Sequence, residues 1–292
     1  MHRKYYLIIS LALFLSSTVA ALASEDVQQR PMISTTLSLM QIDDSKIDST
    51  DASFGYTESS VGLDAQLVFL NVDYREYDWK DSSSFGGRPG IDPWKTLTRI
   101  APGLQYFKKF NEKWAVWPKV AAIAGFEDEI SSDSWTYNPQ VVGLYMYTKQ
   151  MTIYGGLGML YHPIESVVYP VLGVAWNMDS KDGISGAVGF PETMLRYGFN
   201  EKLALKMDFQ WDIRYYRLAD DNDLASGGYV KIEDLIPGLQ IEYEALKGLT
   251  FRLGVRRYLG RKLTVFNSKE NELTSNDVSD SSAYLLGVGY KF

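Results

Sequence analysis

Apolar and polar residues alternate with a period of two along much of the chain. In residues 202–217 the odd positions from Leu203 to Tyr215 are apolar or aromatic, and the even positions from Lys206 to Arg214 are polar or charged. A period of two predicts a β-strand with one apolar and one polar face. Strands of water-soluble sandwiches usually have about five or six residues. An alternation of this length therefore favours a tilted strand that crosses a membrane.

The same alternation recurs in three later segments. It is present at residues 238–245 and 249–259, and the final segment, residues 283–292, places Tyr290 and Phe292 on one apolar face. After residue 24, every apolar run is interrupted too early to form a membrane-spanning helix. The pattern therefore predicts an all-β protein, and we expect a transmembrane antiparallel up-and-down β-barrel.

Short and long connections separate the alternating segments. The short ones carry tight-turn residues, and the long ones are polar and acidic. Outer-membrane barrels show this asymmetry, with short turns on the periplasmic side and long loops outside. The short connections are expected at residues 111–112, 149–150, 200–201 and 245–248, and the long ones at 43–55, 81–93, 127–133, 219–228 and 267–282.

Tryptophan and tyrosine residues cluster near the expected strand ends. Because amphipathic rings favour the membrane–water interface, we predict an aromatic girdle rather than a buried aromatic core. The residues expected in the girdle are Tyr77, Trp79, Trp94, Trp114, Trp117, Trp135, Tyr145, Tyr147, Trp176, Tyr215 and Tyr216.

Two interruptions of the pattern leave the strand number between 12 and 14. Within residues 61–77 the apolar positions switch from odd to even near residues 68–70, which indicates a bulge or a tight turn. The Gly189-Phe190-Pro191 motif is a second interruption, because proline removes a hydrogen-bond donor from a strand. If both interruptions are turns the barrel has 14 strands, which we favour, and if both are bulges it has 12.

The first 23 residues have the three-part pattern of a secretory signal peptide. Arg3 and Lys4 precede an apolar run at residues 5–15, and Ala21-Leu22-Ala23 supplies small residues at a cleavage site. The apolar run is shorter than the ~20 residues that a spanning helix needs. We expect residues 1–23 to be removed during export and residues 24–292 to form one barrel domain.

Composition excludes several kinds of chemistry. The chain has 292 residues, no cysteine and two histidines, His2 and His162, so disulfides, thiol catalysis and thiolate metal sites are excluded. Its formal net charge is −7, and loss of Arg3 and Lys4 would leave 27 basic against 36 acidic residues, a charge of −9. Such a chain lacks the cations that nucleic-acid binding requires. We expect no cofactor and no nucleic-acid partner.

Several short motifs resemble a family of bacterial outer-membrane β-barrels of unknown function. They are Tyr169-Pro170-Val171-Leu172-Gly173-Val174, Gly189-Phe190-Pro191 and residues 197–203, together with the terminal Phe292. The resemblance covers most of the chain after the expected signal peptide. It implies insertion by the barrel assembly machinery, for which a last strand with Tyr290 and Phe292 would be the recognition signal. It implies no catalytic residues.

The polar faces of three long segments are the candidate lumen wall. If the apolar positions contact lipid, the alternate positions face an enclosed interior. One interpretation is a water-filled passage whose charged wall selects solutes. The other is a lattice of ion pairs that satisfies buried charges and stiffens a narrow barrel. The candidate lumen-lining residues are Lys206, Asp208, Gln210, Asp212, Arg214, Gln240, Glu242, Glu244, Arg252 and Arg256.

Glycines and acidic loops also have two interpretations each. The glycines in residues 152–160 and 171–176 either accommodate close packing of Tyr154 or leave room for a hydrophobic solute. The acidic stretches at residues 127–129 and 220–223 either are solvated loops or bind calcium. We favour the structural interpretation of both features.

His162 is the remaining candidate for catalysis, because Glu165 and Ser166 follow it closely. A nucleophile, a base and an orienting group must meet in space, and proximity in the sequence does not establish this. We favour a histidine in a loop or at the membrane interface over a hydrolase active site.

The functional prediction is a passive channel or porin-like transporter of small solutes in the bacterial outer membrane. The alternative is a closed structural or surface-interaction barrel whose loops contact lipopolysaccharide, other cells or proteins. A hydrolase centred on His162 is the least favoured hypothesis. Expected partners are outer-membrane lipid and lipopolysaccharide, the assembly machinery during biogenesis and a small solute.

Overall fold

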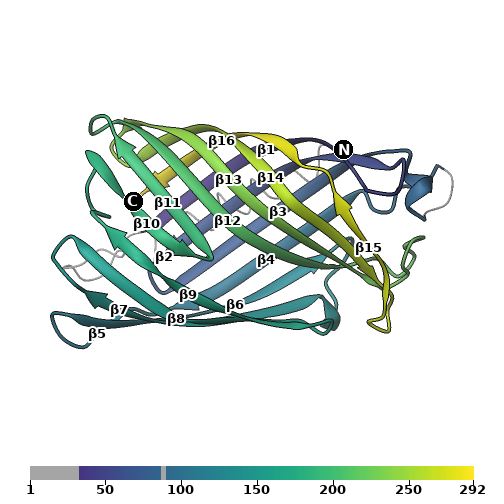
Figure 1. Ribbon diagram of the computed structural model, residues 1–292, viewed down its shortest axis with the longest axis horizontal. Helices are drawn as coiled ribbons and strands as arrows, with labels where there is room; N and C mark the ends of the chain where they lie inside the picture. The colour runs from purple at the N-terminus through teal and green to yellow at the C-terminus, as the bar shows by residue number, and fades with distance from the viewer. Residues whose placement is uncertain (1–32, 87–89) are drawn as a thin grey trace.

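The protein is a closed antiparallel β-barrel in a computed structural model that describes residues 33–86 and 90–292 (Figure 1). The expected signal peptide, residues 1–23, lies outside the described residues. Strands pair in chain order around the barrel, and β1 pairs with β16 to close it. The all-β antiparallel barrel predicted from the alternation is therefore confirmed.

Fourteen strands form the wall. They are β1 (Ile33–Lys46), β2 (Ser53–Ala65), β3 (Val68–Lys80), β4 (Thr96–Gln105), β6 (Trp114–Phe126), β7 (Trp135–Met146), β8 (Met151–Tyr161), β9 (Ser166–Trp176), β10 (Gly183–Phe190), β11 (Glu192–Gly198), β12 (Leu203–Arg217), β13 (Tyr229–Leu246), β14 (Leu249–Phe266) and β16 (Ser281–Lys291). The short β5 (Lys108–Lys109) pairs with β6, and β15 (Glu272–Val278) pairs with the last part of β14. Two short 3-10 helices, η1 (Ser82–Phe85) and η2 (Ser132–Ser134), lie in the loops. In the described chain, no helix is long and apolar enough to cross a membrane.

Both interruptions of the sequence pattern are turns, which confirms the prediction of 14 strands. β2 and β3 pair from Ala65 and Val68 onward, across Gln66, whose φ is 61°. β10 and β11 pair as a hairpin around Pro191, so the missing proline donor falls outside the ladder. The loop predicted at 267–282 is wrong in part, because residues 272–278 form β15 and extend the pairing of β14.

The connections define two ends of the barrel. The turn end carries the short turns, such as Gln66-Leu67 and Lys247-Gly248, and the loop end carries the longer segments 81–95 and 218–228. In Figure 1 the turn end, with the carboxy terminus, lies at the left and β15 lies at the right. β10 and β11 are the shortest strands of the wall, with 8 and 7 residues, and do not extend along its whole length.

Polarity inverts between the two ends, and β3 shows the inversion most clearly. Near the turn end its outer face is apolar, with Val68 and Val72, and its inner face carries Asp73 and Arg75. Toward the loop end the outer face carries charged residues, residues 76, 78 and 80, whereas the inner face is aromatic. An apolar outer face is stable in hydrocarbon, whereas a polar outer face around an apolar interior is stable in water. The turn-end half and the loop-end half therefore suit different surroundings.

The interior of the loop end is filled by a hydrophobic cluster, here called the loop-end core. Strands β1–β4, β12–β14 and β16 contribute to it, and loop residues Phe85, Trp94 and Leu218 fold into it. The indole of Trp79 donates a hydrogen bond of 2.8 Å to the carbonyl of Trp94 and packs edge-on against its ring. Trp94 is only 1% exposed.

This core corrects the prediction of an aromatic girdle. Tyr77, Trp79, Trp94 and Tyr216 are buried in the loop-end core instead of standing at a membrane interface. Other predicted members, including Trp114 and Tyr147, are exposed. The physical reason is that aromatic residues near strand ends can lie on either face of a strand. At the loop end they lie on the inner face, where their rings fill the interior of the barrel.

A direct contact between β6 and β12 closes the loop end. Arg217 of β12 pairs in parallel with Phe126 of β6, and the amide of Glu127 donates to the carbonyl of Arg217 at 2.9 Å. Gly125 permits this approach, because a Cβ there would lie 2.0 Å from the carbonyl oxygen of Tyr215. At the loop end the sheet therefore closes directly from β6 to β12.

The five strands between them, β7–β11, form a segment that we call the flap. At the turn end the flap is paired with β6 on one side and β12 on the other. At its loop end, the inward-facing His162 stacks on Tyr215, which lies on the outer face of β12, with ring centroids 4.3 Å apart. The flap thus overlaps the outside of β12 there and contributes nothing to the loop-end core.

The β6–β12 contact predicts a steric effect of one methyl group. Gly125→Ala should lower the free energy of unfolding in detergent micelles by about 1–3 kcal/mol, as overpacking does, because the new Cβ meets backbone atoms that cannot rotate away. Urea titration measures the change. The matched control is Gly155→Ala, since a Cβ there meets nothing within 4 Å. Equal stability of the two variants would contradict the close contact.

Candidate functional site

A cluster of six charged side chains lies between the loop-end core and the turn end. Glu58 accepts from Arg75 at 2.7 Å and from Arg214 at 2.9 Å, which links β2, β3 and β12. Asp212 pairs with Arg214 at 2.5 Å, and Arg99 of β4 pairs with Asp73 at 2.6 Å. The cluster therefore connects opposite walls of the barrel.

The cluster is electrically balanced and mostly buried. Its three arginines and three carboxylates sum to zero charge, and Arg75 is 0% exposed. Two guanidinium nitrogens of Arg75 have no hydrogen-bond partner in the described chain, but its guanidinium lies 4.8 Å from the ring centre of Tyr56. Buried charges are tolerated when paired in this way, so the cluster is a structural crosslink below the loop-end core.

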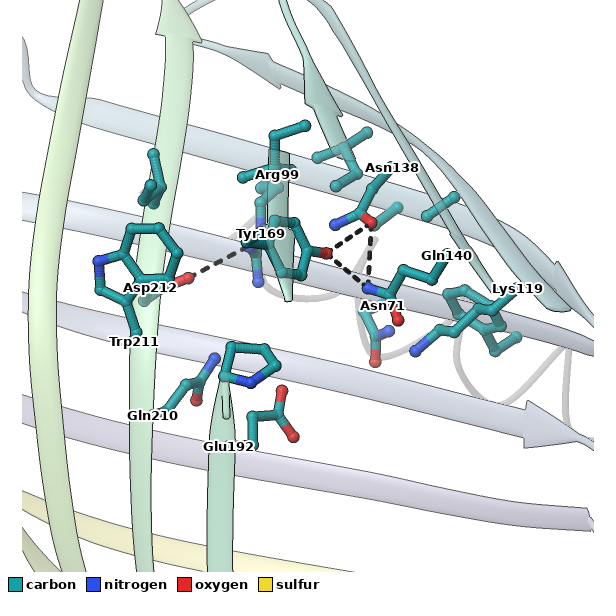
Figure 2. Close-up of a pocket in the computed structure, with 17 residues that line it drawn as sticks. Asn71, Arg99, Lys119, Asn138, Gln140, Tyr169, Glu192, Gln210, Trp211 and Asp212 are labelled. Atoms are coloured by element: carbon teal, nitrogen blue, oxygen red, sulfur yellow. Dashed lines mark hydrogen bonds and ion pairs between the residues drawn. The ribbon is translucent and has the colours of Figure 1, made fainter. Parts of the chain in front are cut away.

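A polar cavity of about 190 Å³, here called the chamber, lies on the turn-end side of this cluster (Figure 2). Its wall is formed by side chains of β3, β4, β6–β9, β12 and the β10–β11 hairpin. A second cavity of about 160 Å³ toward the turn end shares Phe69, Asn71 and Lys119 with it. Together they form a polar space in the half of the barrel whose exterior is apolar.

Hydrogen bonds order one side of the chamber. The hydroxyl of Tyr169 donates to Asn138 at 2.9 Å and accepts from Gln140 at 2.7 Å (Figure 2). The amide of Gln140 also donates to Asn138 at 3.0 Å. This triad fixes the Tyr169 ring at the chamber wall.

Other polar groups of the chamber are free to bind a solute. Within residues 33–86 and 90–292, Asn71, Lys119, Glu192 and Gln210 make no side-chain hydrogen bond or ion pair. The Lys119 ammonium lies 4.6 Å from the ring centre of Phe69. Unpaired donors and acceptors at a cavity wall are typical of a ligand site.

The predicted lumen-lining residues on β12 all lie on its inner face, but in different environments. Gln210 and Asp212 line the chamber. Asp212 also belongs, with Arg214, to the buried charge cluster. Asp208 pairs with Arg256 at 3.1 Å and accepts from Gln240 at 2.5 Å.

The remaining candidates lie nearer the turn end. Glu242 pairs with Arg196 at 3.2 Å, and Glu244 pairs with Lys181 at 2.6 Å, so flap residues supply both cations. Lys206 and Arg252 form no ion pair in the described ranges. Much of the predicted polar face is thus an ion-pair lattice.

Sequence reasoning missed the opposite wall of the chamber. Asn71, Lys119, Asn138, Gln140 and Glu192 come from strands whose alternation is weaker than that of β12. The available signal was an isolated polar residue on an otherwise small or apolar inner face, as Lys119 is between Ala115 and Ala121. Their convergence required the barrel geometry.

Two glycines of the flap serve close packing against tyrosines. A Cβ on Gly158 would lie 2.4 Å from the Tyr169 ring, and one on Gly173 would lie 2.5 Å from the Tyr154 hydroxyl oxygen. The space beside these two glycines is therefore filled by a tyrosine, as the favoured interpretation of this sector predicted, whereas Gly155 adjoins open space.

His162 lies in the loop between β8 and β9 and is 2% exposed. Its Nδ1 accepts from the amide of Ile164 at 3.2 Å, and its ring contacts Tyr215 and Tyr229. Glu165 is bound by the Tyr215 hydroxyl at 2.5 Å and by the Lys231 ammonium. These contacts fix the flap tip on β12 and β13, and they occupy the two groups that a hydrolase would need.

Hydrogen bonds from neutral donors hold the acidic loops together. Glu127 accepts at 2.9 Å from both the amide of Ala219 and the side chain of Asn222. Burial raises the pKa of Glu127, although these hydrogen bonds oppose the shift. In the described segments no cluster of histidine, aspartate or glutamate side chains could hold a metal ion.

Comparisons with known proteins return only distant structures. No protein-family profile and no curated protein sequence matches the chain. An outer-membrane channel from Pseudomonas putida F1 has a TM-score of 0.44 and 10% identity, over 92% of this chain and 97% of that chain. The NanC porin has a TM-score of 0.39 and 10% identity, over 88% and 100% of the two chains. A deletion mutant of the TodX monoaromatic hydrocarbon channel has a TM-score of 0.37 and 12% identity, over 93% and 92%.

The charge cluster predicts a large effect of removing one arginine. Arg214→Met should lower the free energy of unfolding by about 3–5 kcal/mol, because Glu58 and Asp212 then remain buried with too few cations. Lys181→Met removes an exposed ion pair and should cost less than about 1 kcal/mol. Urea titration in micelles separates these values, and a similar small loss in both variants would contradict the structural role of the cluster.

The environment of His162 predicts an unusual titration. Burial lowers its pKa to about 4, with Glu165 opposing the shift. Because the unfolded value is about 6.5, the stability that this neutral ring contributes is fully present above pH ~6.5 and is lost as pH falls through about 4. Carbon-13 NMR of labelled histidine, assigned with His162→Gln, measures the pKa. A value near 6.5 would show that the flap tip is not packed on β12.

Proposed function

We propose that this protein is a channel for small solutes in the bacterial outer membrane. The outer face of its turn-end half carries large exposed apolar side chains, such as Val168 (64% exposed), Leu253 (63%) and Leu157 (62%). Such a band suits the hydrocarbon of a bilayer around a closed barrel. The polar chamber lies inside the same half.

The observation that carries the proposal is the chamber with its unpaired polar groups. A barrel that served only as a scaffold would gain stability from a filled or fully paired interior. Here Asn71 and Gln210 instead present free amides to a cavity that continues toward the turn end. A solute that replaces water at these groups keeps their hydrogen bonds satisfied.

The charges around the chamber favour uncharged solutes. Arg99 and Lys119 are cationic, whereas Glu192 and Asp212 are anionic, so the wall has no net charge. The loop-end core closes the straight path to the other end. The channel therefore has no wide axial pore, and slow, selective flux is expected.

A closed structural or surface-interaction barrel is the second candidate, and the packed loop-end core favours it. In that case the loops would make the functional contacts, with lipopolysaccharide, cells or proteins. The chamber would then hold only water. Flux measurement distinguishes the two candidates.

The same proposal implies that the chain reaches the membrane by the usual assembly route of outer-membrane proteins. The chain would be exported by its signal peptide, residues 1–23, and residues 24–292 would be inserted as one domain by the barrel assembly machinery. Tyr290 and Phe292 support this role, since both are exposed at the turn end with ring centroids 4.7 Å apart. Lipid and lipopolysaccharide would surround the apolar band.

Filling the chamber tests the channel. Purified protein in liposomes should admit radiolabelled methyl β-D-glucoside faster than protein-free liposomes. Ala121→Phe places a ring in the chamber and should lower this flux by about tenfold, equivalent to a barrier of ~1.4 kcal/mol. Ala122→Phe is the matched control, because Ala122 is on the opposite face of β6 and its ring would enter the apolar exterior.

Equal flux through both variants would show that the solute does not cross the chamber. No flux above protein-free liposomes in the folded wild type would overturn the channel and leave the structural candidate.

A further inference from the structure

The wall of the barrel has a seam without backbone pairing. β9 pairs with β10 only from Leu172 to Trp176, and β11 pairs with β12 only up to Gln210. On the loop-end side of the hairpin tip at Pro191, the edge of β9 that faces β12 (residues 166–171) therefore has no paired strand within the described chain. The facing edge of β12, from Trp211 onward, also has no flap strand paired to it there. We call this gap the seam.

Side chains close most of the seam. The Trp211 ring packs edge-on against Tyr169 with centroids 6.3 Å apart, and it lies 5.3 Å from the Phe190 ring. Among the described residues, the only backbone tie at this point is the hydrogen bond from the Trp211 amide to the Pro191 carbonyl at 3.1 Å. A side chain changes rotamer much faster than a strand pair separates, so the seam is the weakest part of the wall.

The chamber extends to the seam. Its lining includes Gln210 and Asp212 from the inner face of β12 and also Trp211 and Ile213 from the outer face. Where no flap strand pairs with β12, a cavity can reach residues of both faces along the open edge of that strand. The chamber therefore extends to the edge of β12 at the seam, and Figure 2 shows Trp211 beside the polar chamber residues.

The outer side of the seam is apolar. Val168 on β9 and Phe209 on β12 are exposed beside it, and Leu235 of β13 is exposed next to Trp211 in the pairing register. These residues belong to the band that would contact lipid. A solute leaving the chamber through the seam would enter the hydrocarbon side of the membrane interface.

We infer that Trp211 is a lateral gate between the chamber and the membrane. The inference rests on the proposed channel function and deepens it. The gate admits small amphipathic solutes with an aromatic or aliphatic body and an uncharged polar head group. The body contacts Trp211 and Tyr169 in the seam, and the head group bonds to free amides such as Gln210 in a chamber of zero net charge.

The flap tip limits how far the gate opens. The stacking of His162 on Tyr215 and the ion pair of Glu165 with Lys231 hold the flap to β12 and β13 above the seam. Movement of Trp211 therefore creates a small opening below a fixed tip. This geometry selects flat, small bodies.

A pair of probes and a pair of variants test the gate. Phenyl β-D-glucoside and methyl β-D-glucoside share a head group and differ in the apolar body. Trp211→Ala in liposomes should raise phenyl glucoside flux about tenfold, the factor that loss of its ring contacts allows, and change methyl glucoside flux by less than about twofold. Met207→Ala, which shortens an exposed side chain on the same face of β12 where that strand is paired with β11, should change neither flux.

The outcomes separate the gate from the channel. If methyl glucoside enters through the wild type but Trp211→Ala leaves phenyl glucoside flux unchanged, or raises both fluxes equally, the lateral gate is wrong and the channel stands. If neither probe enters through the wild type or the Trp211 variant, the channel itself is wrong.

A second variant covers failure of Trp211→Ala to fold. The chain has no cysteine, so a single introduced thiol can be labelled selectively. Ile213→Cys carrying a bulky maleimide should block phenyl glucoside flux, because Ile213 lines the chamber at the seam. The same label on Met207→Cys, in the part of β12 that is paired with β11, should have no effect, and equal block at both positions would overturn the gate.

Discussion

The close approach of β6 and β12 is the constraint on which the rest of the structure depends. It joins two strands that are separated in the wall by five others, and it requires backbone to touch backbone at Gly125. With that contact in place, the inner faces of the loop end come close enough to pack as a solid core. The flap strands are then excluded from the core at this end, and the flap tip overlaps the outside of β12. The seam is the geometric result, since β9 and β12 are left side by side without a ladder.

The charge cluster is the physical boundary between two kinds of interior. On one side of it, rings such as Tyr77 and Tyr216 exclude water, and on the other side amides line a cavity. Charged groups at such a boundary cannot rely on solvent, so they must satisfy one another. Arg214 satisfies two of these charges by pairing with both Glu58 and Asp212, and these pairs span the full width of the barrel. A purely aliphatic layer could not fix the register of opposite walls as specifically.

The sequence predicted the strands, the turns and their number, because a period of two, a phase change and a proline are local signals. It also divided β12 into a polar and an apolar face, and Gln210 and Asp212 of the polar face line the chamber. It could not predict which residues oppose that face, since Asn138, Gln140 and Lys119 approach β12 only through barrel closure. The aromatic girdle was wrong in part, for a related reason. Alternation shows that the two faces of a strand differ in polarity. It does not show which face points into the barrel at a given position along the barrel axis. The charged outer positions near the end of β3 held that information, but only a comparison across neighbouring strands reveals it.

The inversion of polarity along the wall has a consequence for how the fold responds to its surroundings. The loop-end half buries its apolar side chains inside its own β-sheet, as a water-soluble domain does. Its stability therefore does not depend on lipid. In the proposed membrane setting, the lipid bilayer surrounds the turn-end half, so acyl-chain length and fluidity act on it directly. A thinner or stiffer membrane would therefore strain only the half that contains the chamber and Trp211, while the other half remains a rigid reference frame.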